Sequence, residues 1–330
     1  MSKSKKEPKK ISKKSTSYFL QPGDLIDIIA PGSATEAVVL ENCVTALKSW
    51  GYQVRVDSNL LKPELFLSNS DEFRFKDLKN ALLATDSKAI WCLRGGYGSI
   101  RLLPQLNDLK KPKQQKLFIG ISDVSSLHLF LNQKWNWPSL HGPLIDRVGL
   151  GLLSVENIEE MKAVVSGQAK QTVFENLLPL TDKAKSVKKL EGPVIGGNLM
   201  VITSSLGTAS QIRGDGKILF FEEMSERGYR IDRCLQQMKQ AGVFKKVKAV
   251  VLGDFIKCQE PNGTDLSLPT LIQFFQELQM PAFSGVQSGH APLQRPLFFN
   301  TKAQITKSVI DKSCFQMVVY NSNEILKPRK

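Results

Sequence analysis

Short apolar runs alternate with helical patterns along the first half of the chain. The apolar run 25–30 ends at Pro31-Gly32-Ser33, which predicts a buried strand followed by a turn. Apolar residues then recur at helical spacing over 35–50, and Gly51 closes the pattern. Further strands are predicted at 54–56, 88–93 and 116–121, with helices beginning near Asp71 and Asp123. This order predicts an α/β fold with a mostly parallel sheet covered by helices on both faces.

The alternation of strand and helix patterns stops after about residue 150. A helical pattern covers 155–165, and the stretch 181–189 is polar and rich in lysine. We therefore predict an N-terminal domain over 17–165, a linker over 166–190 and a C-terminal domain over 191–322. Within the last domain, strands are predicted at 217–221 and 247–252, and helices at 229–241 and 269–278. These elements indicate a second, smaller α/β or α+β unit.

The net charge of +14 over 330 residues raises the question of a nucleic-acid partner. Seven lysines lie within residues 1–16, and Lys327, Arg329 and Lys330 lie at the other end of the chain. Charge gathered at chain ends is typical of solvated tails. We therefore expect disordered basic tails at 1–16 and 323–330, and no nucleic-acid binding.

Several signals bear on the compartment. No stretch reaches the roughly 18–20 apolar residues of a membrane-spanning helix. The N-terminal lysines are not followed by the apolar segment of a secretory signal. The five cysteines are odd in number, widely spaced and without a C-x-x-C pair, which is typical of reduced thiols. We expect a cytoplasmic protein with no membrane association, no metal site and no cofactor.

Ser122 carries the strongest local signal for chemistry. In Gly120-Ile121-Ser122-Asp123 it follows a predicted strand directly and precedes a predicted helix. A serine at such a sharp turn is exposed, and the first amides of the helix can stabilise an oxyanion because they have no partner within it. The pattern is typical of a nucleophile. The alternative is that Ser122 only caps its helix, a common role of serine.

A serine nucleophile needs a base, and the chain has three histidines. His128 lies in an apolar helical stretch, where a hydrogen-bonded core histidine is the simpler interpretation. His141 follows a possible strand, and His290 lies in a turn between apolar segments, a place typical of catalytic residues. The residues alone leave the base open between His290 and His141, and they favour His290.

An acidic residue must orient the base. Glu222 and Glu223 end the apolar strand predicted at 217–221, and Glu226 is a third candidate. Because successive side chains of a strand point to opposite faces, only one of the first two faces the site. The pattern does not say which one.

The turn Gly95-Gly96-Tyr97-Gly98 follows another predicted strand. It lacks the spacing of a dinucleotide-binding loop, because Arg101 stands where the last glycine would be. We expect this turn to let the backbone approach a substrate.

Several segments, taken together and in order, resemble the LD-carboxypeptidase family. This family includes murein tetrapeptide carboxypeptidases and microcin-immunity peptidases. The resemblance rests on residues 29–33, 89–98, 120–123, 141–143, 196–199, 221–223, 229–233 and 289–290.

The resemblance implies roles for particular residues. Ser122 would be the nucleophile, His290 the base and Glu222 its partner, with an oxyanion hole formed by the backbone amides of Gly96 and Asp123. It also implies a flavodoxin-like N-terminal domain and a smaller C-terminal domain built around a β-barrel. The expected protein is a metal-free homodimer and a serine carboxypeptidase. It would release terminal D-alanine from peptidoglycan tetrapeptides in murein recycling by cleaving an L,D-peptide bond.

Two alternative functions stay open at this point. One is a microcin-immunity-like peptidase acting on peptide–nucleotide conjugates, and the other is a non-catalytic protein that binds muropeptides or nucleic acid. For a carboxypeptidase, the guanidinium of an arginine suits a free terminal carboxylate. Arg230 closely follows the acidic pair and is our candidate for that role, and an arginine on a helix surface is an equally good interpretation.

Overall fold

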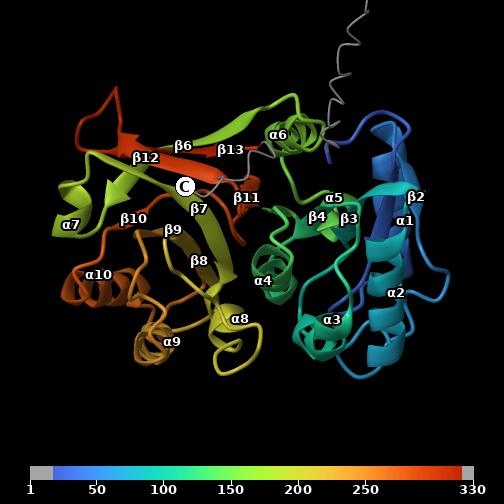
Figure 1. Cartoon of the computed structure of the whole chain (residues 1–330), viewed down its shortest axis with the longest axis horizontal. Helices are drawn as coiled ribbons and strands as arrows, with labels where there is room; N and C mark the ends of the chain where they lie inside the picture. Colours follow the sequence, from blue (N-terminus) through green and yellow to red (C-terminus); the bar gives the residue numbers. More distant parts are fainter. Residues whose placement is uncertain (1–17, 322–330) are drawn as a thin grey trace, which may run out of the picture.

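The computed structural model describes residues 18–321. The tails expected at 1–16 and 323–330 lie outside the described residues. Within them, the chain forms a mostly parallel sheet covered by helices and, beside it, a closed barrel (Figure 1). None of the helices in this range combines the length and the apolar character needed to cross a membrane.

The first half is a six-stranded sheet with the order β11-β5-β4-β3-β1-β2. Strands β1 to β5 run parallel, and β11 pairs antiparallel with β5. The order 2-1-3-4-5 is that of flavodoxin-like folds, so the predicted fold class is confirmed. The elements are β1 (Leu25–Ile29), α1 (Ala37–Ser49), β2 (Gln53–Arg55), α2 (Asp71–Leu83), β3 (Ser87–Cys92), η1 (Ser99–Leu102), α3 (Leu103–Asp108), β4 (Leu117–Gly120), η2 (Ser122–Val124), α4 (Ser125–Lys134), β5 (Ser139–His141), α5 (Ile145–Gly149), α6 (Val155–Val165) and, from far along the chain, β11 (Leu297–Phe299).

The second half is a closed barrel with the order β10-β6-β13-β12-β7-β8-β9. Strands β7 to β10 run parallel to one another, whereas β6, β12 and β13 pair antiparallel with their neighbours. The barrel-based C-terminal domain is thereby confirmed. The elements are β6 (Gln171–Pro179), α7 (Asp182–Lys185), β7 (Lys189–Asn198), α8 (Leu199–Thr203), β8 (Ile218–Met224), α9 (Gly228–Gln240), β9 (Ala249–Ile256), α10 (Ser267–Glu277), β10 (Ala282–Ser284), β12 (Lys302–Lys307) and β13 (Phe315–Tyr320).

Strand β6 lies where the sequence led us to expect a linker over 166–190. It pairs with β13 and β10 and thereby closes the barrel. Phe174 and Leu177 of β6 are buried, whereas Glu175 and Asn176 between them are exposed, and Asn176 has a φ of 58°. This polar pair interrupts the alternation of apolar positions, so the pattern did not reveal the strand. The lysine-rich stretch that follows supplies α7 and the first residue of β7.

The two halves share a continuous apolar core. Phe299 belongs to the sheet of the first half, and its ring packs 5.1 Å from the ring of His141 and 5.9 Å from that of Phe220 in the barrel. At the same border the backbone N–H of Asn198, the last residue of β7, donates to Ser125 Oγ at 3.0 Å. The end of a barrel strand is therefore fixed against the start of α4.

Candidate active site

Ser122 lies at the turn between β4 and α4, where the sequence predicts it. Its φ of 65° falls in the left-handed region, which is unfavourable for a residue with a Cβ atom. Strain of this kind is typical of a nucleophile held at a strand-to-helix turn. The 3-10 turn η2 precedes α4, so the α-helix begins two residues later than the start expected at Asp123. The N-cap of α4 is Val124 and no side chain caps it, so Ser122 does not act as a helix cap.

The glycine-rich turn after β3 lies against Ser122. A Cβ atom at Gly95 would be 2.9 Å from Ser122 Cβ, a distance that only glycine allows. Gly96 follows with a φ of 84°. Across residues 18–321, the backbone N–H groups of Gly96 and Asp123 have no hydrogen-bond partner. One of these amides follows Ser122 and the other follows Gly95, so both are available for an oxyanion at this point.

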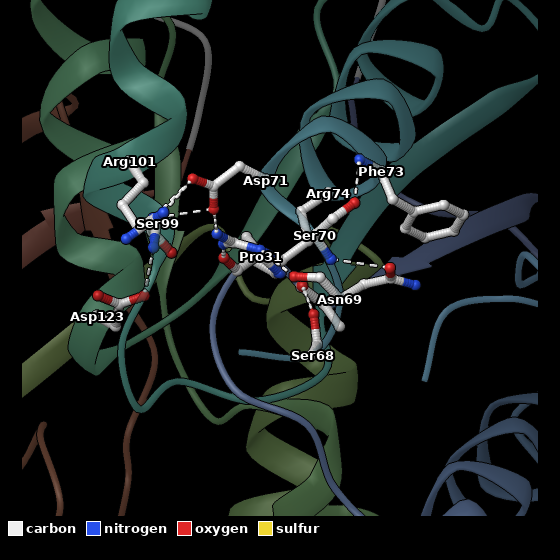
Figure 2. A network of polar contacts seen from close by, with 11 residues as sticks. Pro31, Ser68, Asn69, Ser70, Asp71, Phe73, Arg74, Ser99, Arg101 and Asp123 are labelled. Carbon is white, nitrogen blue, oxygen red and sulfur yellow. Dashed lines mark hydrogen bonds and ion pairs between the residues drawn. The ribbon is translucent and has the colours of Figure 1, made fainter. Parts of the chain in front are cut away.

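A network of polar contacts supports this turn (Figure 2). Buried Asp123 accepts a hydrogen bond from the backbone N–H of Ser99 at 2.8 Å. Buried Arg74 of α2 donates to the carbonyl oxygen of Pro31 and to Asp71. The network therefore ties the loops that follow β1 and β3 to each other and to α2. Other contacts in it join Arg101 to Asp71, Arg74 to Asn69, and Phe73 to Ser70, which caps α2.

His290 and Glu222 meet across the barrel end. Glu222 on β8 is fully buried, and its Oε2 lies 2.6 Å from His290 Nδ1. Burial lowers the pKa of His290, but the charge and hydrogen bond of Glu222 outweigh burial and raise the pKa above its ordinary value of 6.5. Because Nδ1 is used for Glu222, Nε2 is available for a hydroxyl or a leaving group. This pairing is what a serine nucleophile requires of its base.

Glu223 points away from His290 and is also buried. Its Oε1 accepts hydrogen bonds from Asn198 Nδ2 at 2.9 Å and from the backbone N–H of Met224 at 2.8 Å. Its Oε2 accepts one from the backbone N–H of Met200 at 2.9 Å. Burial raises the pKa of Glu223 to about 7. Of the two neighbouring acids, Glu222 therefore reaches His290, and Glu223 joins β8 to the start of α8.

The other two histidines are fully buried. His128 Nδ1 lies 2.8 Å from Ser139 Oγ, and its Nε2 lies 2.7 Å from the carbonyl oxygen of Gly120. Burial lowers the pKa of His128 to about 4, which agrees with the expected core histidine. His141 Nδ1 lies 3.0 Å from Ser288 Oγ, and burial lowers its pKa far below the ordinary value. Its environment is that of a neutral structural residue.

His141 links the two parts of the site. In the sheet it pairs with Gly120, which lies two residues before Ser122. Its ring contacts Ser288, which lies two residues before His290. The nucleophile candidate and the base candidate are thus attached to the same buried side chain by short segments. In the described part of the chain, no hydrogen bond joins Ser122 to His290 directly, and such bonds often tighten only when substrate binds.

The sequence did not single out Asp254, a second carboxylate near His290. Asp254 Oδ2 accepts from the backbone N–H of Ala291 at 3.4 Å, and burial raises its pKa to about 6. Gly289 passes close by, because a Cβ atom there would lie 3.1 Å from Glu222 Oε2 and 3.2 Å from Asp254 Cβ. The available signal was an acid after a glycine at the end of the buried strand predicted at 247–252.

Arg230 lies exposed on α9. Its Nη1 is 3.2 Å from Glu226 Oε2, and its Nε donates to the hydroxyl of Tyr229 at 3.3 Å. Glu226, the third acidic candidate, therefore pairs with Arg230. No group of three or more His, Cys, Asp or Glu side chains within residues 18–321 is arranged to hold a metal ion.

Comparison with known proteins gives consistent matches over most of the chain. The LD-carboxypeptidase N-terminal domain matches residues 26–142, and the LD-carboxypeptidase C-terminal domain matches residues 191–305. A putative carboxypeptidase of Rickettsia conorii is 37% identical over 286 residues, which cover 86% of this chain and 88% of the relative. A probable murein peptide carboxypeptidase of Bacillus subtilis is 32% identical over 276 residues, covering 82% and 85%.

Solved structures agree with these matches. The crystal structure of a muramoyltetrapeptide carboxypeptidase from Oxalobacter formigenes superimposes with a TM-score of 0.77 at 29% identity, covering 90% of this chain and 98% of that one. The microcin C7 self-immunity protein MccF shares the fold, with a TM-score of 0.76 at 19% identity, covering 94% of this chain and 98% of that one. With both domain models matched and relatives above 30% identity over most of the chain, the protein belongs to the LD-carboxypeptidase family of peptidases.

Proposed function

We propose that this peptidase is a serine-type LD-carboxypeptidase with Ser122 as nucleophile. His290 takes the Ser122 proton as Oγ attacks the scissile carbonyl, and it then protonates the leaving amine. Glu222 orients the ring and stabilises its charged form. The amides of Gly96 and Asp123 receive the oxyanion. Water activated by His290 then hydrolyses the acyl-enzyme.

The observation that carries this proposal is the 2.6 Å contact between His290 Nδ1 and the fully buried Glu222. It stands near a strained serine whose neighbouring amides are free of partners within residues 18–321. His128 and His141 have burial-lowered pKa values and bond to structural partners, which leaves His290 as the best base.

The substrate that we propose is a peptidoglycan tetrapeptide, from which the enzyme releases terminal D-alanine. Relatives named for murein peptides and a structural neighbour named for muramoyltetrapeptide support this assignment. The test is mass spectrometry of purified disaccharide tetrapeptide after incubation with the enzyme. Loss of one alanine is expected with the wild-type protein, and an unchanged mass is expected with Ser122→Ala. An unchanged mass with wild-type protein contradicts the substrate assignment.

The microcin-immunity alternative has weaker support, because MccF at 19% identity shares only the fold. A panel that contains aminoacyl sulfamoyl adenylates beside the tetrapeptide distinguishes the two activities. A non-catalytic muropeptide or nucleic-acid binder would leave Ser122 unlabelled by a fluorophosphonate probe, whereas the proposed enzyme is labelled.

We also propose a cytoplasmic enzyme that works as a homodimer. All five cysteines are free and buried in the structure, which suits a reducing compartment. The homodimer comes from the family resemblance, and sedimentation equilibrium tests it. Cell fractionation tests the compartment.

A further inference from the structure

The short helix α5 carries two adjacent charged residues, each with one buried polar atom that lacks a partner. Asp146 Oδ1 and Arg147 Nε are both buried, and neither has a hydrogen bond in the described part of the chain. A buried polar atom without a partner is unfavourable, so a native structure rarely keeps one without a reason. Two on consecutive residues indicate a place prepared for a polar ligand.

This helix lies against the glycine-rich turn that faces Ser122. The backbone N–H of Asp146 donates to the carbonyl oxygen of Leu93 at 3.1 Å, directly before Arg94. The side chain of Leu144 lies near Gly95, since a Cβ atom there would be 3.4 Å from Leu144 Cδ1. The segments that follow β3 and β5 thus bring Arg94 and Arg147 to Asp146, next to this turn.

The charges at this point are not balanced. Asp146 is the acid near both arginines: burial raises its pKa, and the charges of Arg94 and Arg147 lower it. Within residues 18–321 the Nε of Arg147 is buried without a partner, whereas Arg94 is exposed to solvent. The charge of Arg147 also lowers the pKa of His290, although less than Glu222 raises it. Around Asp146, two cations and one anion leave one positive charge for a ligand.

We propose that Arg147, assisted by Arg94, binds the terminal carboxylate of the peptide substrate. The inference rests on the proposed carboxypeptidase function. In a leaving amino acid, a single carbon separates the carboxylate from the nitrogen that His290 protonates. The group that binds the carboxylate must therefore lie close to the reacting atoms, and α5 carries Arg147 against the glycine-rich turn that faces Ser122. A planar guanidinium suits such a carboxylate because it can donate two parallel hydrogen bonds.

This assignment replaces the sequence-based candidate Arg230. The guanidinium of Arg230 is already bonded to Glu226 and Tyr229. Arg147 lies outside both segments matched by the domain models, which end at residue 142 and resume at 191. The family motifs therefore give no indication of a role for Arg147.

The test compares the free tetrapeptide with its C-terminal amide. We expect Arg147→Gln to lower kcat/KM for the free acid by about 10- to 100-fold, the value of a charge-assisted hydrogen bond. Cleavage of the amide should change little, and Arg147→Lys should restore part of the loss. Exposed Arg213→Gln is the control for removal of a positive charge elsewhere. An effect through the pKa of His290 would change both substrates alike, so the acid-to-amide ratio isolates the carboxylate contact.

A binding experiment separates this inference from the proposed function. The Ser122→Ala protein should bind the free tetrapeptide more tightly than the amide in calorimetry, and Arg147→Gln in that background should abolish the preference. If wild-type protein releases no alanine, the proposed function fails and this preference still decides the inference. An equal loss for acid and amide in Arg147→Gln, or a preference abolished by Arg230→Gln instead, overturns it.

Discussion

Ser122 and His290 are held in place in different ways by the two halves of the molecule. Ser122 owes its position to its own backbone, which bends at a φ of 65° between β4 and α4, and to the absence of a side chain on Gly95. His290 owes its position to side chains from other segments, chiefly the carboxylate of Glu222 at 2.6 Å. Asp254 fixes the turn around it through the amide of Ala291.

The difference shows which residues of the chain determine the position of each catalytic candidate. The bend at the nucleophile is encoded in the consecutive residues of β4, η2 and α4, and Gly95 only leaves room for it, whereas the base depends on residues of β8 and β9 that lie far from it along the chain. A change in the sheet half should therefore act through shape and strain. A change in the barrel half should act through charge and hydrogen bonding.

Removal of either reacting group should have the largest effect on turnover, because the nucleophile from one half and the base from the other act in the same chemical step. Ser122→Ala and His290→Ala should each reduce kcat on the tetrapeptide by roughly 10⁴–10⁶, with the double variant little worse. Circular dichroism checks that the variants are folded. Effects that multiply in the double variant would mean that the two residues act independently.

Substitution of the two acids should separate charge placement from structural support. Glu222→Gln should reduce kcat by about 10³–10⁴ with little loss of stability, because the ring loses its ionic partner. Glu223→Gln should lower the free energy of unfolding by about 1–3 kcal/mol instead, because its amide group cannot accept all three N–H donors. Steady-state kinetics and urea unfolding measure the two effects. The reverse ranking in kcat would assign the catalytic role to Glu223.

A methyl group on the glycine-rich turn should test whether shape alone positions the nucleophile. Gly95→Ala places a Cβ atom 2.9 Å from Ser122 Cβ, and we expect kcat/KM to fall by about 10- to 100-fold. Gly142→Ala is the matched control, since its Cβ atom would meet Met161 at an ordinary 3.5 Å. The control should stay near wild type. Equal activity of the two variants would show that the glycine-rich turn can shift to accommodate the methyl group without displacing Ser122.

The contrast also explains which parts of the fold and of the candidate site could be predicted from the sequence. Strand–helix alternation predicted the parallel sheet, and the turn at Ser122 was visible locally because strand, glycine and helix are contiguous. The choice of Glu222 over Glu223 needed the family resemblance, since it depends on which face of β8 meets a turn 68 residues away. Strand β6 was missed because its polar pair Glu175–Asn176 breaks the alternation. Asp254 and Arg147 were missed because only tertiary contacts distinguish them from ordinary surface charges.

The pH dependence of activity should reflect the titration of His290, which the barrel half holds. His290 must be neutral to accept a proton, and its pKa is raised, so activity should fall on the acid side at a pH above 6.5. In Glu222→Gln the acid limb should move to lower pH, because the raising charge is gone. For stability the sign is opposite: the raised pKa favours the folded state fully below pH 6.5, and this contribution is lost as pH rises through the folded value. An acid limb that stays in place in Glu222→Gln would contradict the coupling.

The smallest effect should come from relief of strain at Ser122. Ser122→Gly and Ser122→Ala both remove the hydroxyl and should be equally inactive, but only glycine adopts a φ of 65° without a Cβ penalty. We expect the glycine variant to exceed the alanine variant by about 1 kcal/mol in the free energy of unfolding. Urea unfolding of both proteins, monitored by tryptophan fluorescence, measures the difference. Equal stability would show that the turn relaxes around alanine, and the strain at the nucleophile would then not be a property that the sheet half maintains.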